Sequence, residues 1–189
     1  MTFVCLGISV VLHGPATTAS IMTNPVPTTE HAHHTRADRK HAFSVGLPPS
    51  EAFLLFEPVG EKNWAEGWRP VFASSEDARL HDGSVFTVTR PHPIHGSIES
   101  VWMVSRYEPP HRIEYRNVEA GRRASWISVH CEAAGERTTR VSVRYVITGL
   151  SKEGDDHITK MTEPAFREMI DGWSKRIANY LERGTPATP

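Results

Sequence analysis

The alternation of hydrophobic and polar residues is the strongest signal along this chain. It recurs in six stretches between residues 70 and 150, bounded by turn residues such as HDG, EPPH and AAGE. A period of two is typical of strands that bury one face. Because only short turns join neighbouring stretches, the pattern predicts an antiparallel meander. The stretches are PVFAS (70–74), SVFTVTR (84–90), SIESVWMVSRY (97–107), HRIEYRNV (111–118), RASWISVHCEA (123–133) and TTRVSVRYVITGL (138–150).

One more strand and two short helices are predicted ahead of this meander. HAFSV at 41–45 alternates like a half-buried strand, and the following PPS ends it and lets Ser50 cap a helix over EAFLLFEP. A second short helix is predicted at about Glu61–Trp68. On such a helix Trp64 and Trp68, four residues apart, would lie on the same side.

The end of the chain predicts a long amphipathic helix over 154–183. Its apolar residues recur at spacings of three or four, which places them on one stripe. Thr162 and Pro164 predict a kink or a fresh start within it, and Gly184 is expected to end it. The stripe consists of Met161, Ala165, Met169, Trp173, Ile177 and Tyr180.

Parity predicts which strand side chains face the core. In RVSVRYVI, RIEYR and WISVHC the positions that alternate with the polar residues should point inward. In ESVWMVSRY, placing Arg106 outside turns the odd-numbered positions inward and leaves Trp102 and Val104 outside. The predicted inner set is Glu99, Val101, Met103, Ser105, Tyr107, Ile113, Tyr115, Ile127, Val129, Cys131, Val141, Val143, Tyr145 and Ile147.

Composition favours one soluble domain in a reduced compartment. A chain of 189 residues buries about 70% of its unfolded surface, so it needs no metal or disulfide to fold. With 21 Lys and Arg against 22 Asp and Glu, the chain has no broad attraction for nucleic acid or an anionic membrane. Because Cys5 and Cys131 are far apart, we expect no disulfide framework and a cytoplasmic location.

The N-terminal part predicts little folded structure. An apolar run from Phe3 to Leu12 hints at a secretory signal, but no Lys or Arg precedes it and it is too short to span a bilayer. A true start at Met22 is the alternative. Residues 21–40 are polar and include HAHH at 31–34, which we interpret as a flexible tail rather than a metal site. The expected organisation is a disordered or weakly ordered extension over 1–40, a folded domain over 41–183 and a tail over 184–189.

The order of elements and three local motifs resemble a known superfamily. The segment LPPSEAFLLFEPVGEKNWAEGWRPVF contains a G-E-x-x-W-x-x-G-W-x-P pattern, followed by VWMVSRYEPPHRIEYRNV and TTRVSVRYVITGLSKEG. Over residues 41–183 the chain resembles the START and birch-pollen-allergen-like (SRPBCC) superfamily, in its bacterial polyketide cyclase/dehydrase-like branch. The resemblance implies an α+β helix-grip fold. In that fold a curved antiparallel sheet of about seven strands wraps around a long C-terminal helix, with two short helices after the first strand.

The resemblance also implies a cavity between sheet and helix that accepts a hydrophobic or aromatic small molecule. Aromatic rings and methionines suit such a wall, because they give large and adaptable contact areas. The alternative for the tryptophans is that they plug the open end of the sheet, and for the helix residues that they form ordinary core. The expected ligand contacts are Trp64, Trp68, Phe86, Val101, Met103, Tyr107, Ile127, Met161, Phe166, Met169 and Trp173.

The sequence contains little that points to a specific chemistry. It has no Gly-rich phosphate loop, GxSxG elbow, HExxH or paired CxxC motif, and HPIH at 92–95 is expected to be a solvated loop, so neither cofactor nor metal is predicted. The candidate acid–base residues are Glu99, Tyr115 and Tyr145, if they face the cavity. The alternatives are a solvated carboxylate for Glu99 and hydroxyls bonded to the backbone for the tyrosines.

Three functions are compatible with this sequence. The leading hypothesis is a carrier or sensor that binds a hydrophobic or aromatic small molecule without a cofactor. The second is a polyketide cyclase/dehydratase-like enzyme that uses acid–base groups in the cavity. The third is an interaction module like the activators of the Hsp90 ATPase, which would require a filled cavity and an exposed apolar patch. No nucleic acid and no membrane span are expected, and the oligomeric state, a homodimer included, stays open.

Overall fold

A computed structural model of the protein describes residues 33–77 and 79–184. The apolar run at 3–12, the alternative start at Met22, Cys5 and most of the predicted terminal tail lie outside the described residues. None of the helices in the described part of the chain combines the length and the apolarity that crossing a bilayer requires.

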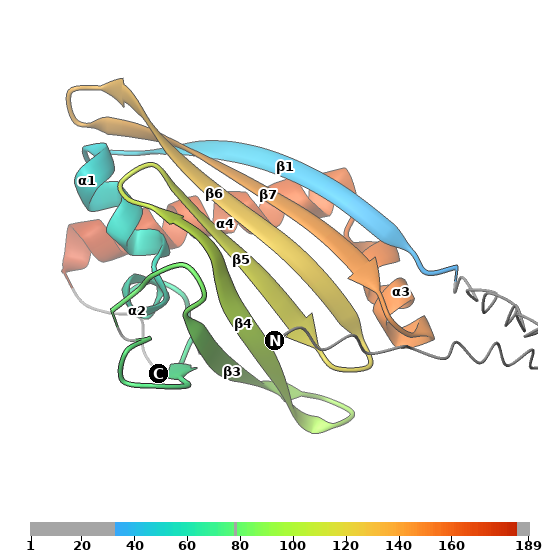
Figure 1. Cartoon of the computed structure of the whole chain (residues 1–189). Coiled ribbons are helices and arrows are strands. Elements are labelled where there is room, and N and C mark those ends of the chain that lie inside the picture. The colour runs from blue at the N-terminus through green and yellow to red at the C-terminus, as the bar shows by residue number, and fades with distance from the viewer. Residues whose placement is uncertain (1–32, 78, 185–189) are drawn as a thin grey trace, which may run out of the picture. The chain divides into compact units, whose positions relative to one another are not determined.

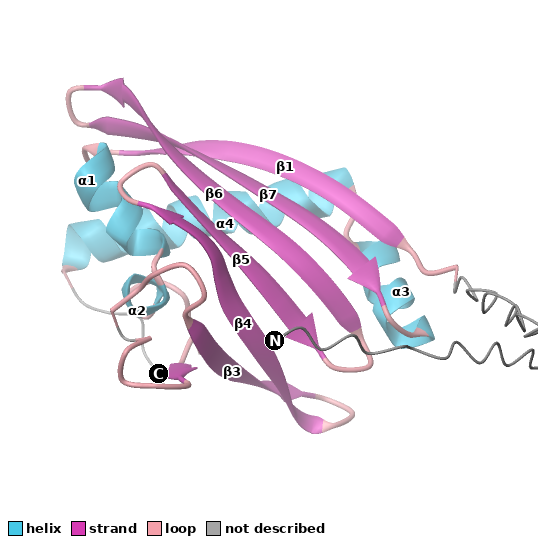
Figure 2. Ribbon diagram, viewed as in Figure 1, coloured by secondary structure: helices cyan, strands magenta, loops and turns pink. Residues whose placement is uncertain are grey.

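The strands form a single antiparallel sheet in the order β1-β7-β6-β5-β4-β3-β2 (Figures 1 and 2). The predicted meander is confirmed, because each strand from β2 to β7 pairs with the next along the chain, and β1 pairs with β7. The strands are β1 Arg36–Val45, β2 Pro70–Phe72, β3 Val85–His92, β4 Gly96–Glu108, β5 Arg112–Glu119, β6 Arg123–Gly135 and β7 Thr138–Gly149.

The first strand begins earlier than the sequence indicates. We expected it at residue 41, but β1 pairs with β7 continuously from Arg36 to Val45. Residues 36–40 are mostly charged, so they give no apolar alternation, yet their backbone groups bond to β7 all the same. Ala37 is buried in a small cluster with Ile147 and Ile158. Residues 36–40 are therefore part of the sheet.

The helices lie on one side of the sheet (Figures 1 and 2). The predicted restart near Thr162 is confirmed, because Thr162 caps α4 by accepting a hydrogen bond from the Ala165 amide. Gly184, at φ 63°, ends α4 as expected. The curved sheet with a long C-terminal helix against one face is the predicted helix-grip fold. The helices are α1 Pro49–Ala52, the 3-10 helix η1 Phe53–Phe56, α2 Pro58–Glu61, α3 Lys152–Lys160 and α4 Glu163–Arg183.

Two details of the predicted short helices are wrong. Ser50 does not cap the first helix, which begins after Pro48 without a side-chain cap. The helix predicted at 61–68 is absent, because α2 ends at Glu61 and residues 62–67 form turns and a bend. Gly67 adopts a left-handed conformation at φ 71°, which a regular helix does not permit. Trp64 and Trp68 therefore lie on a looped segment.

Burial confirms the parity predicted for three strands. The inner side chains of β5, β6 and β7 form one core cluster with η1 and α4. That cluster includes Ile113, Tyr115, Ile127, Val129, Cys131, Val141 and Val143.

The parity predicted for β4 is wrong over most of its length. Trp102 and Val104 are buried, whereas Val101 and Met103 are 47% and 43% exposed. The register between β4 and β5 shifts between Val104 and Arg106. A bulge inserts one residue, so the inner positions are even-numbered before it and odd-numbered after it. The alternation counted back from Arg106 therefore assigns the wrong face to the residues before the bulge.

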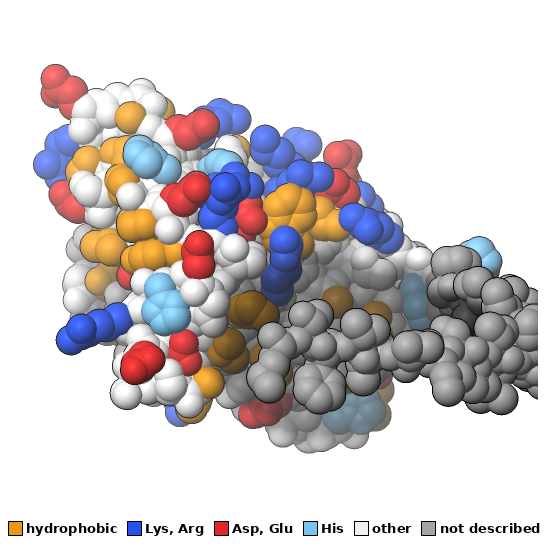
Figure 3. All heavy atoms as spheres, in the orientation of Figure 1, with side chains coloured by type: hydrophobic (Ala, Val, Ile, Leu, Met, Phe, Trp, Pro, Cys, Tyr) orange, Lys and Arg blue, Asp and Glu red, His pale blue; other side chains and the backbone are white. Residues whose placement is uncertain are grey.

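The sheet face opposite α4 is largely charged. Figure 3 views the molecule from that side and shows Lys, Arg, Asp and Glu side chains interspersed with small groups of hydrophobic ones. On this face the guanidinium carbons of Arg116 and Arg144 lie 5.0 and 5.2 Å from the centre of the Trp126 ring.

A substitution at Gly60 tests how closely α2 packs against η1. A Cβ at Gly60 would lie 1.8 Å from the Leu54 carbonyl oxygen, so α2 approaches η1 closely only with glycine there. We expect Gly60→Ala to lower the free energy of unfolding by about 1–3 kcal/mol, measured by urea denaturation. Gly46→Ala is the matched control, because its added Cβ meets nothing within 4 Å. Equal stability of the two variants would contradict this account of the α2–η1 contact.

Candidate functional site

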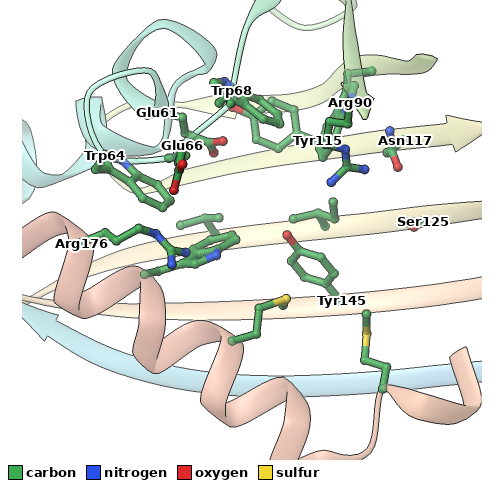
Figure 4. A pocket seen from close by; sticks show the side chains of 18 of the residues that line it. Glu61, Trp64, Glu66, Trp68, Arg90, Tyr115, Asn117, Ser125, Tyr145 and Arg176 are labelled. Carbon is green, nitrogen blue, oxygen red and sulfur yellow. The ribbon is translucent and has the colours of Figure 1, made fainter. Parts of the chain in front are cut away.

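A cavity of about 480 Å³ lies between the sheet and α4. Its wall combines the segment from α2 to Trp68, the inner face of β3 to β7, and residues of α3 and α4 (Figure 4). Many of the residues predicted to contact a ligand or to act on it line this cavity. They are Trp64, Trp68, Tyr115, Ile127, Tyr145, Met161, Met169 and Trp173.

Six other predicted site residues do not line the cavity. Phe86 and Phe166 are buried in the core beside it, and Tyr107 packs against the core while its hydroxyl donates to Glu57 Oε1 at 2.6 Å. Glu99, Val101 and Met103 point to the outer face because of the bulge in β4. Glu99 is exposed there, which removes the carboxyl that the sequence offered as the best catalytic acid.

The two tryptophans both stabilise the loop and line the cavity. The indole N–H of Trp64 donates to the Leu55 carbonyl at 2.7 Å, and that of Trp68 to the Pro58 carbonyl at 2.8 Å. The Trp64 ring lies 5.3 Å from that of Trp173 on α4, measured between centroids. The structural role and the lining role that the sequence left as alternatives therefore occur together.

Glu61 is the carboxyl that the cavity contains in place of Glu99. It is the last residue of α2, lines the cavity and is 9% exposed. Burial raises the pKa of this carboxyl well above its ordinary value of 4.5, which favours the neutral acid. Figure 4 shows its side chain beside Trp64 at one end of the cavity. The sequence signal was its place in the G-E-x-x-W pattern, which we used for the fold and not for chemistry.

Of the two candidate tyrosines, one is bonded to the backbone. The Tyr115 hydroxyl donates to the Phe56 carbonyl at 2.8 Å. The Tyr145 ring packs against Phe166 and Trp173 with centroids 5.5 and 6.3 Å away. Burial raises the pKa of both phenols, and the nearby Glu61 raises it further, so both hydroxyls stay protonated at neutral pH. Tyr145 is the candidate hydroxyl for a ligand.

The far end of the cavity is polar, which the sequence analysis missed. Arg90 on β3, Asn117 on β5 and Ser125 on β6 lie there, opposite Glu61 and Trp64 (Figure 4). Each occupies an inner-face position that continues the parity of its strand. The alternation in these three strands therefore already places the polar residues on the inner face. They follow the apolar inner residues toward one end of each strand.

The two histidines of HPIH lie close to a carboxylate outside the cavity. One ligand atom each of His92, His95 and Glu153 falls within 4.8 Å of the others. A guanidinium already occupies this cluster, since Arg122 lies 3.0 Å from Glu153 Oε1 and 3.4 Å from His92 Nε2. Nδ1 of His92 also accepts hydrogen bonds from the amides of Ile94 and His95 at 3.3 Å.

No protein-family model and no curated protein sequence matches the chain. Solved structures match its fold. A conserved protein from Geobacillus kaustophilus is similar over 79% of this chain and 97% of its own, with 11% identity and a TM-score of 0.58. The Mll3558 protein from Rhizobium loti is similar over 77% and 99%, with 13% identity and a TM-score of 0.57.

Truncated norcoclaurine synthase from Thalictrum flavum is similar over 82% of this chain and 99% of its own, with 9% identity and a TM-score of 0.56. At these identities the similarity shows a shared fold and carries no information on ligand or reaction. The expected polyketide cyclase/dehydrase-like branch therefore stays a prediction. What these proteins share with this chain is the helix-grip fold.

Proposed function

We propose that the protein binds a hydrophobic or aromatic small molecule in the cavity between the sheet and α4. The observation that carries this proposal is the cavity itself, a space of about 480 Å³ within the fold. A packed core leaves few voids larger than a water molecule, whereas this space, which is partly open to solvent, is large enough to hold a small organic molecule. Its volume lies in the range typical of small-molecule sites.

The composition of the wall supports the same proposal. Trp64, Trp68, Trp102 and Trp173 offer flat aromatic faces, and Met161 and Met169 offer flexible, polarisable side chains. Apolar walls with a few polar groups are typical of sites that bury most of a small ligand. The third hypothesis, an interaction module, requires a filled cavity and stays an alternative.

A second candidate function is proton-transfer catalysis on the bound molecule. Glu61 favours it, because a neutral carboxyl in an apolar site can donate a proton and then accept one. The Tyr145 hydroxyl lines the same cavity and offers a hydrogen bond to a ligand carbonyl. In this hypothesis Glu61 takes the role that the sequence gave to Glu99.

Filling the cavity tests the binding proposal. Met169 lines the cavity from α4, so Met169→Trp should reduce its volume and weaken binding of the neutral probe N-phenylnaphthylamine by about tenfold or more in calorimetric titration. Leu181→Trp is the control, because Leu181 lies on the same helix and is 39% exposed outside the cavity. Equal affinity of both variants for this probe would overturn the proposal.

The second candidate requires that Glu61 is protonated in the folded protein. With a raised folded-state pKa, the stability that this proton provides is complete below pH 4.5 and is lost as pH rises toward the folded-state pKa. Glu61→Gln removes this loss, so the melting temperature of the variant relative to wild type should increase as the pH rises above about 4.5.

Glu66→Gln is the matched control, because it removes a carboxyl from the same cavity at an exposed position. Parallel pH profiles for wild type and Glu61→Gln would exclude a neutral Glu61 and with it this role in proton transfer. Conversion of carbonyl compounds by the wild type but not by Glu61→Gln, followed by mass spectrometry, would establish the enzymatic function directly.

A further inference from the structure

The cavity has two chemically different ends. Aromatic side chains lie at one end together with Glu61, Glu66 and Arg176, and Arg90, Asn117 and Ser125 lie at the other (Figure 4). A purely apolar ligand would leave the second end without partners. The polar end therefore indicates that the ligand has a polar group, which the apolar wall alone does not show.

Positive charge exceeds negative charge around the polar end. Arg90, Arg122 and Arg123 all contact Glu119, whose side chain is 2% exposed. Arg122 also pairs with Glu153 at 3.0 Å, so three guanidinium groups share two carboxylates. Of these five groups, only Arg90 and Arg123 line the cavity.

The neighbouring histidine adds no compensating charge. His157 Nε2 lies 2.7 Å from Arg123 and lines the cavity. Burial lowers the pKa of His157, and the nearby Arg123 lowers it further, so the imidazole is neutral at neutral pH. His157 therefore leaves the cationic excess of the arginines unchanged.

Arg123 is largely buried at this end of the cavity, with its side chain 14% exposed. Ser125, two residues further along the same face of β6, and Asn117, its cross-strand partner, place further polar groups beside it.

We propose that the ligand is an amphipathic organic acid, whose carboxylate binds at Arg90 and Arg123 and whose aromatic or hydrophobic body lies toward Trp64 and Trp173. This inference rests on the proposed binding function and specifies its ligand class. Guanidinium groups bind carboxylates through paired, charge-assisted hydrogen bonds, which fix both position and direction. The cationic end would therefore orient the molecule along the cavity and bring its other end to Glu61.

Two probes of nearly equal shape and different charge test this inference. Naphthylacetic acid is an anion at neutral pH, and naphthylacetamide is its neutral counterpart. We expect wild-type protein to bind the acid about tenfold more tightly than the amide, measured by calorimetry at low ionic strength. Arg90→Gln and Arg123→Gln should each weaken binding of the acid by about tenfold and leave binding of the amide unchanged, which also shows that the variants are folded.

Two further substitutions make the result specific to this end of the cavity. Arg116→Gln removes a guanidinium from the outer face of the same sheet and should leave both affinities unchanged. Arg176→Gln removes the cation at the opposite end of the cavity (Figure 4) and should also keep the preference for the acid. The proposed orientation would be overturned if Arg176→Gln lost the preference for the acid while Arg90→Gln and Arg123→Gln kept it.

The remaining outcomes separate the two proposals. If the amide and N-phenylnaphthylamine bind but the acid has no advantage, the inference on the ligand class is wrong and the binding function stands. If none of the three probes binds, the binding function is overturned, and the inference fails with it.

Discussion

The structure depends on how one helix covers the inner face of a seven-stranded curved sheet. Every strand is paired with its neighbours, and the inner face presents apolar side chains that must be removed from water. A single helix, α4, contacts only part of that face. The segment from η1 to Trp68 covers a further part, held by the indole N–H groups of Trp64 and Trp68 on backbone carbonyls. The part of the inner face that neither α4 nor this segment covers borders the cavity. The elements that stabilise the fold therefore also form the site.

The chemistry of the site follows from how its polar groups are distributed along that space. Glu61 sits where α2 ends among aromatic rings, and burial raises the pKa of its carboxyl. Arg90 and Arg123 sit at the opposite end, where ion pairs with Glu119 hold them in place. A buried carboxyl with a raised pKa at one end and the arginine cluster at the other make the two ends of the cavity chemically different. This difference distinguishes the site from a plain apolar pocket, and the proposals on proton transfer and on ligand class derive from it.

Most of the architecture could be predicted, because the signals for it are local. Alternation identified the strands of the meander, and the break at Thr162 separated α3 from α4. The failures have a common cause. The bulge between Val104 and Arg106 leaves no distinct mark in the sequence, so parity taken from one side of it was inverted on the other. Likewise, the spacing of Trp64 and Trp68 fits a helix, whereas contacts with distant segments hold them on turns.

The sequence by itself determined the fold class, the order of the strands and the aromatic and methionine side chains available to a ligand, because these depend on periodicity and residue type. Only the tertiary structure decided that Glu61 rather than Glu99 is the buried carboxyl, and that Arg90 and Arg123 meet at one end of the cavity. The physical reason is that burial and charge proximity are properties of several strands and helices together. A carboxyl is solvated or neutral, and an arginine is exposed or buried in a cavity wall, according to what the rest of the fold places beside it.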